Sequence, residues 1–159
     1  MKKWITAIAL LVFVLLTGCS EKQQAPALNP VVLSEVRDTV LQEMDIQEPF
    51  LLETEALMNL YGIDAQWVAS SAGFVTMNGT FPDEVIFVEA ADEASAEQIR
   101  TKLQGRLDEV LVQSQTYDAE NYALAQACTV MVDETYVCLI LSPNHEQIAE
   151  LYRSSLYSE

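Results

Sequence analysis

Val85-Ile86-Phe87-Val88-Glu89-Ala90, followed within a few residues by a helical repeat over residues 93–115, is the stretch that decides the fold. Its β-branched and aromatic residues are typical of a strand. In the segment that follows, the apolar residues recur at helical spacing. A strand that leads into a long amphipathic helix predicts a sheet with helices packed against it. The apolar positions of the predicted helix are Ala96, Ile99, Leu103, Leu107, Val110 and Leu111.

Further strands and helices are predicted on both sides of this stretch. Residues 67–77 form a predicted strand that is joined to Val85–Ala90 through the turn residues Asn78-Gly79 and Pro82-Asp83. Residues 128–132 and 136–141 predict a second hairpin. The element order favours a single α+β domain, with an antiparallel sheet of about four strands and helices packed on one face. The other predicted helices cover residues 33–44, 53–60, 117–127 and a segment that begins with Ser142 as N-cap and Pro143.

The N-terminus has the order of a bacterial export signal. Lys2 and Lys3 precede a short apolar run over residues 4–16, and small residues, Thr17 and Gly18, precede Cys19. The run is shorter than the roughly 20 apolar residues of a membrane-spanning helix. We therefore expect residues 1–18 to be a lipoprotein signal peptide that is cleaved between Gly18 and Cys19.

Leu16-Thr17-Gly18-Cys19 resembles the lipobox of bacterial lipoproteins, in which the cysteine thiol receives a diacylglycerol. Lipidation of Cys19 by acyl chains such as palmitate would hold the protein at the extracytoplasmic face of the cell membrane. Residues 20–30 are rich in polar residues and proline, a composition that does not pack a core. We expect residues 19–31 to form the lipidated cysteine and a flexible tether, and residues 32–159 to form the domain.

The charge of the chain excludes some partners. There are 24 acidic and 8 basic residues in 159, a formal net charge of −16. A nucleic-acid surface needs Lys and Arg to replace the counterions of the phosphates, so we exclude nucleic-acid binding. Attraction to anionic lipid is disfavoured for the same reason, so the acyl chains alone would hold the protein on the membrane.

One part of the pattern resembles a known family. The stretch Leu57 to Asp64, with its Tyr-Gly-Ile-Asp end, followed by Trp67-Val68, is similar to the domain of unknown function 4358 found in small lipoproteins of Gram-positive bacteria. The resemblance covers roughly residues 35–157. It implies an anchor on the outer face of the cytoplasmic membrane and a small α+β domain. It implies no activity, ligand or catalytic residue. The resemblance is also carried by the strand Glu84–Ala90, the helix around Ile99–Leu107 and the segment Tyr136–Ile140.

Two cysteines remain besides Cys19, and two states are open for them. If the second hairpin turns about Asp133, Cys128 and Cys138 lie opposite each other, within reach of a strained disulfide. Export would permit that oxidation. The alternative is a pair of buried free thiols that act as small apolar residues.

The sequence offers few groups for catalysis or metal binding. His145 is the only histidine, and it lies in the first turn of a predicted helix. No Cys-x-x-Cys pair, calcium-loop pattern or glycine-rich phosphate loop is present. We therefore expect no catalytic residue, no metal and no cofactor, and predict that the protein is not an enzyme.

Aromatic residues supply the candidate binding surface. Tyr61, Trp67 and Phe74 surround the loop that leads into the first predicted strand, and Asp64 lies within that loop. Aromatic side chains are favoured at interfaces, although burial in the core is common for them. Asp64 would orient a polar group of the partner or cap the turn.

Three functions are left open by the sequence. We predict a non-catalytic, membrane-anchored module that binds another envelope protein. The alternative is a small-molecule or peptide-binding accessory to a transporter. An envelope enzyme would require acids such as Glu84 and Asp118 to converge in the fold.

Overall fold

The computed structural model describes residues 28–77, 79 and 81–157. Its centre is a five-stranded antiparallel sheet in the order β1-β2-β3-β5-β4. The strands are β1 Phe50–Leu52, β2 Val68–Val75, β3 Glu84–Ala90, β4 Thr129–Asp133 and β5 Tyr136–Leu141. The helices are α1 Leu33–Glu43, α2 Thr54–Tyr61, α3 Glu93–Tyr117, α4 Ala119–Ala127 and α5 His145–Leu156, with a short 3₁₀ turn, Ala65–Trp67, before β2.

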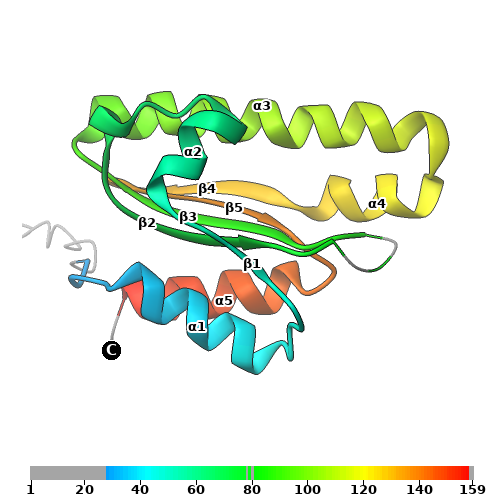
Figure 1. Ribbon diagram of the computed structural model, residues 1–159, viewed down its shortest axis with the longest axis horizontal. Coiled ribbons are helices and arrows are strands. Elements are labelled where there is room, and N and C mark those ends of the chain that lie inside the picture. The colour runs from blue at the N-terminus through cyan, green and yellow to red at the C-terminus, as the bar shows by residue number, and fades with distance from the viewer. Residues whose placement is uncertain (1–27, 78, 80, 158–159) are drawn as a thin grey trace, which may run out of the picture.

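Helices cover both faces of the sheet. Helices α1 and α5 pack on one face, and α2, α3 and α4 lie on the other (Figure 1). The central strands explain why two layers are needed, because every residue of β5 and all but one residue of β3 are buried. A strand that is apolar on both sides must be covered on both sides.

The face under α1 and α5 is closed and apolar. Its centre is Phe87 of β3, which stacks on Tyr152 of α5 with the ring centroids 5.0 Å apart. Both side chains are fully buried. The Tyr152 hydroxyl is also buried and lacks a hydrogen-bond partner among the described residues. Packing therefore accounts for the stability of this face.

The face under α3 has its core at one end of the long helix. Ile99, Leu103 and Leu107 of α3 are buried against Ile86 and Val88 of β3 and their neighbours. Helix α3 begins at the N-cap Asp92, whose carboxylate accepts a hydrogen bond of 2.7 Å from the Ser95 amide. It ends at Asp118, which caps the start of α4.

The predicted single α+β domain with one antiparallel sheet is confirmed, and the structure adds two features. Strand β1 is a fifth strand of three residues, too short to give an alternating pattern in the sequence. The second difference is that helices lie on both faces rather than one, as the burial of β3 and β5 requires.

One helix start also differs from its prediction. Helix α5 begins at His145 rather than at Ser142-Pro143. The Ser142 hydroxyl does accept a hydrogen bond from the Asn144 amide, but it donates one of 2.6 Å to the Asp83 carboxylate. Ser142 therefore ties β5 to the start of β3 and precedes the helix by three residues.

The two ends of the described fold lie side by side. The Asn29 amide donates a 3.0 Å hydrogen bond to the Leu156 carbonyl at the end of α5. Both ends lie at the left of Figure 1, whereas β2 ends and β3 begins at the right. Within the described residues, no helix combines the length and apolar character needed to cross a bilayer. The predicted cleavage site at Gly18 and Cys19, and the tether up to residue 27, lie outside the described residues.

Candidate functional site

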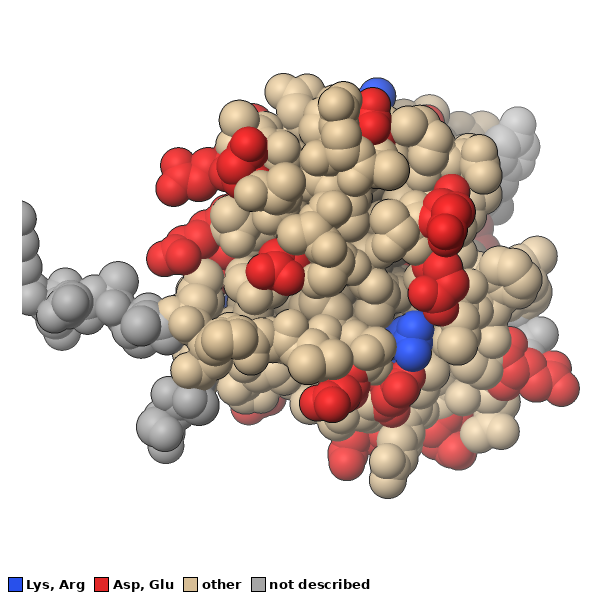
Figure 2. Space-filling view, turned by 60° about the vertical axis from the view of Figure 1, so that its left-hand side comes forward, with Lys and Arg blue, Asp and Glu red and all other residues tan. Residues whose placement is uncertain are grey.

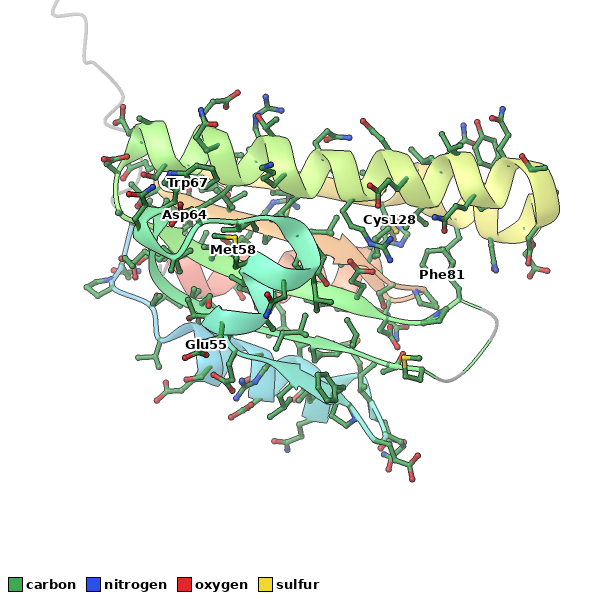
Figure 3. The ribbon with its side chains drawn as sticks, turned by 45° about the horizontal axis from the view of Figure 1, so that its top comes forward. Glu55, Met58, Asp64, Trp67, Phe81 and Cys128 are labelled. Carbon is green, nitrogen blue, oxygen red and sulfur yellow. The ribbon has the colours of Figure 1, made fainter. Side chains whose placement is uncertain are left out.

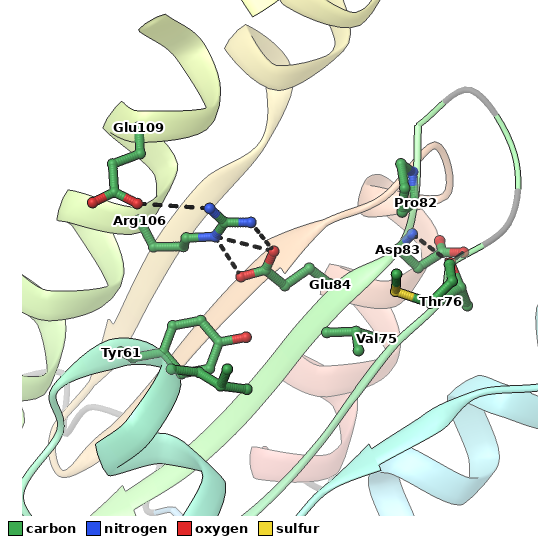
Figure 4. A pocket seen from close by; sticks show the side chains of 10 residues that line it. Tyr61, Val75, Thr76, Pro82, Asp83, Glu84, Arg106 and Glu109 are labelled. Atoms are coloured by element: carbon green, nitrogen blue, oxygen red, sulfur yellow. Dashed lines mark hydrogen bonds and ion pairs between the residues drawn. The ribbon is translucent and has the colours of Figure 1, made fainter. Parts of the chain in front are cut away.

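A solvent-open pocket of about 420 Å³ lies between α2, α3 and the adjoining ends of β2 and β3 (Figure 4). We call it the Glu84 pocket. Its walls come from these four elements, which follow one another along the chain between residues 54 and 117. Its lining residues are Leu60, Tyr61, Val75, Thr76, Met77, Pro82, Asp83, Glu84, Arg106 and Glu109.

An ion pair between β3 and α3 forms the back of this pocket. Glu84, the first residue of β3, has its side chain on the α3 side and is 8% exposed. The Arg106 Nε lies 2.9 and 3.1 Å from the two Glu84 carboxylate oxygens, and Nη2 lies 2.8 Å from one of them. The remaining guanidinium nitrogen, Nη1, lies 3.6 Å from the Glu109 carboxylate. This bidentate geometry fixes the Arg106 side chain in one orientation.

Tyr61 adds a neutral hydroxyl to the same pocket. It is the last residue of α2, and Gly62, at a φ of 64°, ends the helix in the left-handed conformation as expected. The Tyr61 ring directs its hydroxyl toward the Glu84 carboxylate (Figure 4). Burial, then the Glu84 charge and hydrogen bonding to it, raise the pKa of Tyr61 well above its usual value. The phenol is therefore protonated throughout the physiological pH range.

The floor of the pocket is held by Asp83. Its amide donates a 2.8 Å hydrogen bond to the Thr76 hydroxyl, and its carboxylate accepts the hydrogen bond from Ser142. These contacts join the end of β2, the start of β3 and the end of β5. The lining is thus fixed by backbone and side-chain contacts before any ligand arrives.

Three large apolar side chains border the pocket and are exposed to water. Phe50, Leu60 and Met77 are 64%, 58% and 85% exposed. Leu60 and Met77 belong to the lining, and Phe50 lies opposite Val75 in the β1–β2 pairing. Paired residues of an antiparallel sheet direct their side chains to the same face, so Phe50 faces the side of the pocket. We call these three residues the apolar rim.

A second hollow adjoins the first. It has a volume of about 230 Å³ and shares Pro82, Glu84 and Arg106 with the Glu84 pocket. The ion pair therefore forms a partition between two hollows under α3. The other residues lining the second hollow are Phe81, Val110, Gln113, Ser114, Asn121 and Leu141.

The surface is acidic beyond the pocket. Figure 2 shows carboxylates spread over the face turned toward the viewer, with few basic groups among them. This agrees with the 24 acidic and 8 basic residues of the whole sequence. A ligand that approaches this protein meets a negative potential.

The predicted binding residues do not form one surface. Tyr61 lines the Glu84 pocket, but Phe74 is completely buried on the opposite face of the sheet. The expectation that Phe74 belongs to a binding surface is therefore wrong, and the core alternative holds. The aromatic pattern located the first strand but did not reveal which face each ring occupies.

Asp64 and Trp67 follow the end of α2 and do not belong to the lining of the pocket. The Asp64 carboxylate caps the 3₁₀ turn by accepting 3.0 Å hydrogen bonds from the amide and the side chain of Gln66. Trp67 is half-buried against the core under α3. Figure 3 shows both residues at one end of the domain and Phe81 at the other.

The two described cysteines are free thiols on opposite faces of the sheet. The two-residue turn after Asp133 pairs Cys138 with Met131, so Cys128 does not lie opposite Cys138 as the disulfide alternative required. Cys138 belongs to the core under α1 and α5, and Cys128 belongs to the core under α3. Burial raises the pKa of both thiols.

The other groups considered for catalysis are separated from one another. The Asp118 carboxylate accepts hydrogen bonds from the Glu120 and Asn121 amides as a helix cap, and Glu84 is held by Arg106. His145 lies at the start of α5, with Nδ1 3.2 Å from the Ser142 carbonyl. Among the residues that the structure describes, no three His, Cys, Asp or Glu side chains are grouped to hold a metal ion.

Sequence reasoning missed Arg106, Met77 and the apolar rim. Glu84 and Arg106 are 22 residues apart, and no local spacing relates a strand start to the middle of a helix. The only signal in the sequence was the scarcity of basic residues, 8 against 24 acidic ones. Each basic residue, Arg106 included, was therefore a candidate for an ion pair inside the fold.

One comparison with known proteins gave a match. A family model described as Domain of unknown function (DUF4358) matches residues 42–142. This range contains all five strands and every residue that lines the Glu84 pocket. Neither the curated proteins nor the solved structures gave a match.

Proposed function

The chain belongs to the family of the domain of unknown function DUF4358, and from this premise we propose a lipid-anchored, non-catalytic binding module of the cell envelope. In this proposal the domain engages a segment of another envelope protein at the Glu84 pocket and its apolar rim. The family brings no activity with it, so the proposal rests on the pocket and on the N-terminal sequence.

The anchor is supported by the sequence. Residues 1–18 have the charged, apolar and small-residue order of a lipoprotein signal, and Cys19 follows them. This arrangement is typical of bacterial lipoproteins. The described fold starts at the end of the domain away from the Glu84 pocket, so a partner would reach the pocket from the side away from the anchor.

The observation that carries the binding role is the exposed apolar rim beside a preformed pocket. Phe50, Leu60 and Met77 are each more than half exposed, although each would gain free energy from burial. Large apolar side chains that gather beside a pocket are typical of protein-binding surfaces. Strand β1 adds an open sheet edge beside the rim, because it is the outermost strand next to β2.

The chemistry of the lining supports binding over catalysis. Both Glu84 oxygens are engaged by Arg106, and the Asp83 carboxylate is engaged by Ser142 and Thr76. Among the described residues of the lining there is no histidine or cysteine to act as base or nucleophile.

A second candidate is the binding of a small molecule on behalf of a transporter. The volume of about 420 Å³ favours it, since ligand sites commonly measure about 300–1,000 Å³. A screen of amino acids, sugars, peptides and metal ions by thermal shift would test this candidate. A ligand that raises the melting temperature only while the Glu84 pocket is intact would favour it over a protein partner.

Membrane attachment is tested by the variant Cys19→Ala. We expect the native chain to fractionate with membranes and to incorporate labelled palmitate, and the variant to lose the label. An unchanged label in the variant would overturn the anchor.

The protein partner is tested by photo-crosslinking in intact cells from position 77, at the rim. We expect one defined crosslinked species that disappears when Phe50→Ser and Leu60→Ser are introduced. Val112→Ser is the matched control, because Val112 is 68% exposed on α3 and lines neither hollow. A crosslink that survives the rim changes, or none at all, would contradict the proposed function.

A further inference from the structure

We infer that the Glu84 pocket receives a basic side chain, lysine or arginine, from the partner segment, while the apolar rim contacts the residues next to it. This inference rests on the proposed function and specifies the chemistry of the partner. It is carried by the charges of the lining, the engagement of Arg106 and the shape of the apolar wall.

The lining has an excess of negative charge. It contains the three carboxylates of Asp83, Glu84 and Glu109 and the single guanidinium of Arg106. Lys102 lies one turn before Arg106 on α3, but it is exposed and lies beside Gly62, outside the lining. With three carboxylates and one guanidinium, the described lining carries a formal net charge of 1 − 3 = −2.

Arg106 does not offer an anion site. Its Nε and Nη2 groups are both directed at the Glu84 carboxylate, and its third nitrogen lies near Glu109. An anionic ligand would have to displace Glu84, which would leave a buried carboxylate without its partner. The pocket is therefore selective against carboxylate and phosphate groups.

Acceptors for a cation lie toward the open side of the pocket. The Glu109 side chain is 67% exposed, and its nearest contact with Arg106 is long, with 3.6 Å between Oε2 and Nη1. The Tyr61 hydroxyl, a neutral donor and acceptor, lies beside Glu84. Each carboxylate has about four lone-pair positions, so Glu84 can accept from a ligand as well as from Arg106.

The rest of the wall suits the stem of such a side chain. Leu60, Val75 and Met77 line one side of the pocket, and Pro82 adds a further apolar surface. Lysine and arginine bury their methylene stems along apolar surfaces and keep their charged ends among polar groups. A basic side chain satisfies both parts of the lining at once.

Charge also selects among the occupants of the rim. A second copy of this chain would bring another net charge of −16 to an acidic surface, and an anionic lipid surface would be repelled likewise. A basic protein segment gains from the same field. We therefore assign the rim and pocket to one occupant, a segment with a lysine or arginine next to apolar residues.

The test uses three small probes that differ in one terminal group. Nα-acetyl-lysine amide, Nα-acetyl-norleucine amide and Nα-acetyl-glutamate amide are titrated into the full chain in mild detergent, with methionine methyl groups labelled for NMR. Met77 belongs to the lining of the pocket, and Met131, which lies in the core on the opposite face, is the internal control.

We expect the lysine probe to shift the Met77 signal with a Kd about tenfold below that of the norleucine probe, and the glutamate probe to bind most weakly. Glu109→Gln should reduce the lysine preference several-fold. Glu150→Gln, an exposed carboxylate on α5 at the other face, should leave it unchanged.

Equal binding of the lysine and norleucine probes, or tightest binding of the glutamate probe, would overturn this inference. If the rim crosslink of the preceding section persists in that case, the protein-binding role stands and only the basic side chain is wrong. If the lysine preference is found while the crosslink is absent, the pocket chemistry stands and the protein-binding role fails.

Discussion

The two faces of the sheet are built differently. Under α1 and α5 the interior is closed and apolar, with the Phe87–Tyr152 stack at its centre. Under α2 and α3 the apolar core gives way to the Glu84–Arg106 pair, two hollows and three exposed apolar side chains. Both faces have a buried apolar core, and the comparison teaches that only the face under α2 and α3 combines that core with an open, polar end.

Removing the ring of Phe87 should have the largest effect. Phe87→Ala leaves a cavity in a fully buried stack, and we expect a loss of about 3–5 kcal/mol in the free energy of unfolding by urea denaturation. The rim change Phe50→Ala should alter it by about 0.5 kcal/mol or less. Similar losses in the two variants would break the distinction between the faces.

Breaking the ion pair should cost less. Arg106→Met leaves Glu84 buried without its cation, and we expect a loss of about 2 kcal/mol because a third of the Arg106 side chain is exposed and screened by water. The double variant Glu84→Leu with Arg106→Met should regain most of this loss in a double-mutant cycle. Arg100→Met, on the exposed side of α3, is the control and should change stability little.

The Tyr152 hydroxyl allows a pH test of the closed face. Burial, and after it the interaction with the neighbouring Cys138 and Asp133 side chains, raises the pKa of Tyr152 above its usual value. Above about pH 10 the unfolded chain releases this proton while the folded chain keeps it, so stability falls as the pH rises. Tyr152→Phe should reduce that fall by up to about 1.4 kcal/mol per pH unit.

At neutral pH the same variant should be as stable as the native chain or more so. The hydroxyl that it removes is buried and lacks a partner among the described residues, so no hydrogen bond is lost. Urea midpoints at pH 7, 9.5 and 10.5 measure both effects. A large loss at pH 7 would mean that the hydroxyl has a stabilising contact.

The smallest expected effect is a difference in thiol reactivity. Cys128 and Cys138 lie in the cores of opposite faces, so the rate at which each thiol reacts measures how readily its face opens. In a Cys19→Ala background, Cys128, 6% exposed at the end of α4, should react with a thiol reagent before Cys138, which is fully buried in β5. The variants Cys128→Ala and Cys138→Ala show which kinetic phase of the thiol reaction belongs to which cysteine. The reverse order would mean that the closed face opens first.

The fold could be predicted because its elements carry their own periodicity. The apolar residues of α3 and the strand residues of β3 are recognisable within a few turns or residues of chain. Strand β1 was missed because three residues hold no pattern, and their strand conformation comes from pairing with residues 73–75 of β2. The second helical layer was missed as well. Every residue of β5 is buried, which requires cover on both faces of the sheet, whereas helices were predicted on one face only.

The site was less accessible to sequence reasoning. Tyr61 was found because it is one of the aromatic residues beside the loop that leads into the first predicted strand, and the structure places it in the pocket lining at the end of α2. Phe74 was assigned to the same surface although the pleat of β2 directs it to the other face. The pairing of Glu84 with Arg106 depends on how α3 crosses the sheet, which no local pattern records.

The contact between Asn29 and Leu156 has a mechanical consequence. A pull on the N-terminal end of the domain loads a backbone hydrogen bond to the last turn of α5, so α1 and α5 bear the force together. These helices cover the closed face, while the strand ends that hold the Glu84 pocket lie at the other end of the sheet. Tension at the N-terminus would therefore load the α1–α5 layer first, and the Glu84 pocket would bear little of the force.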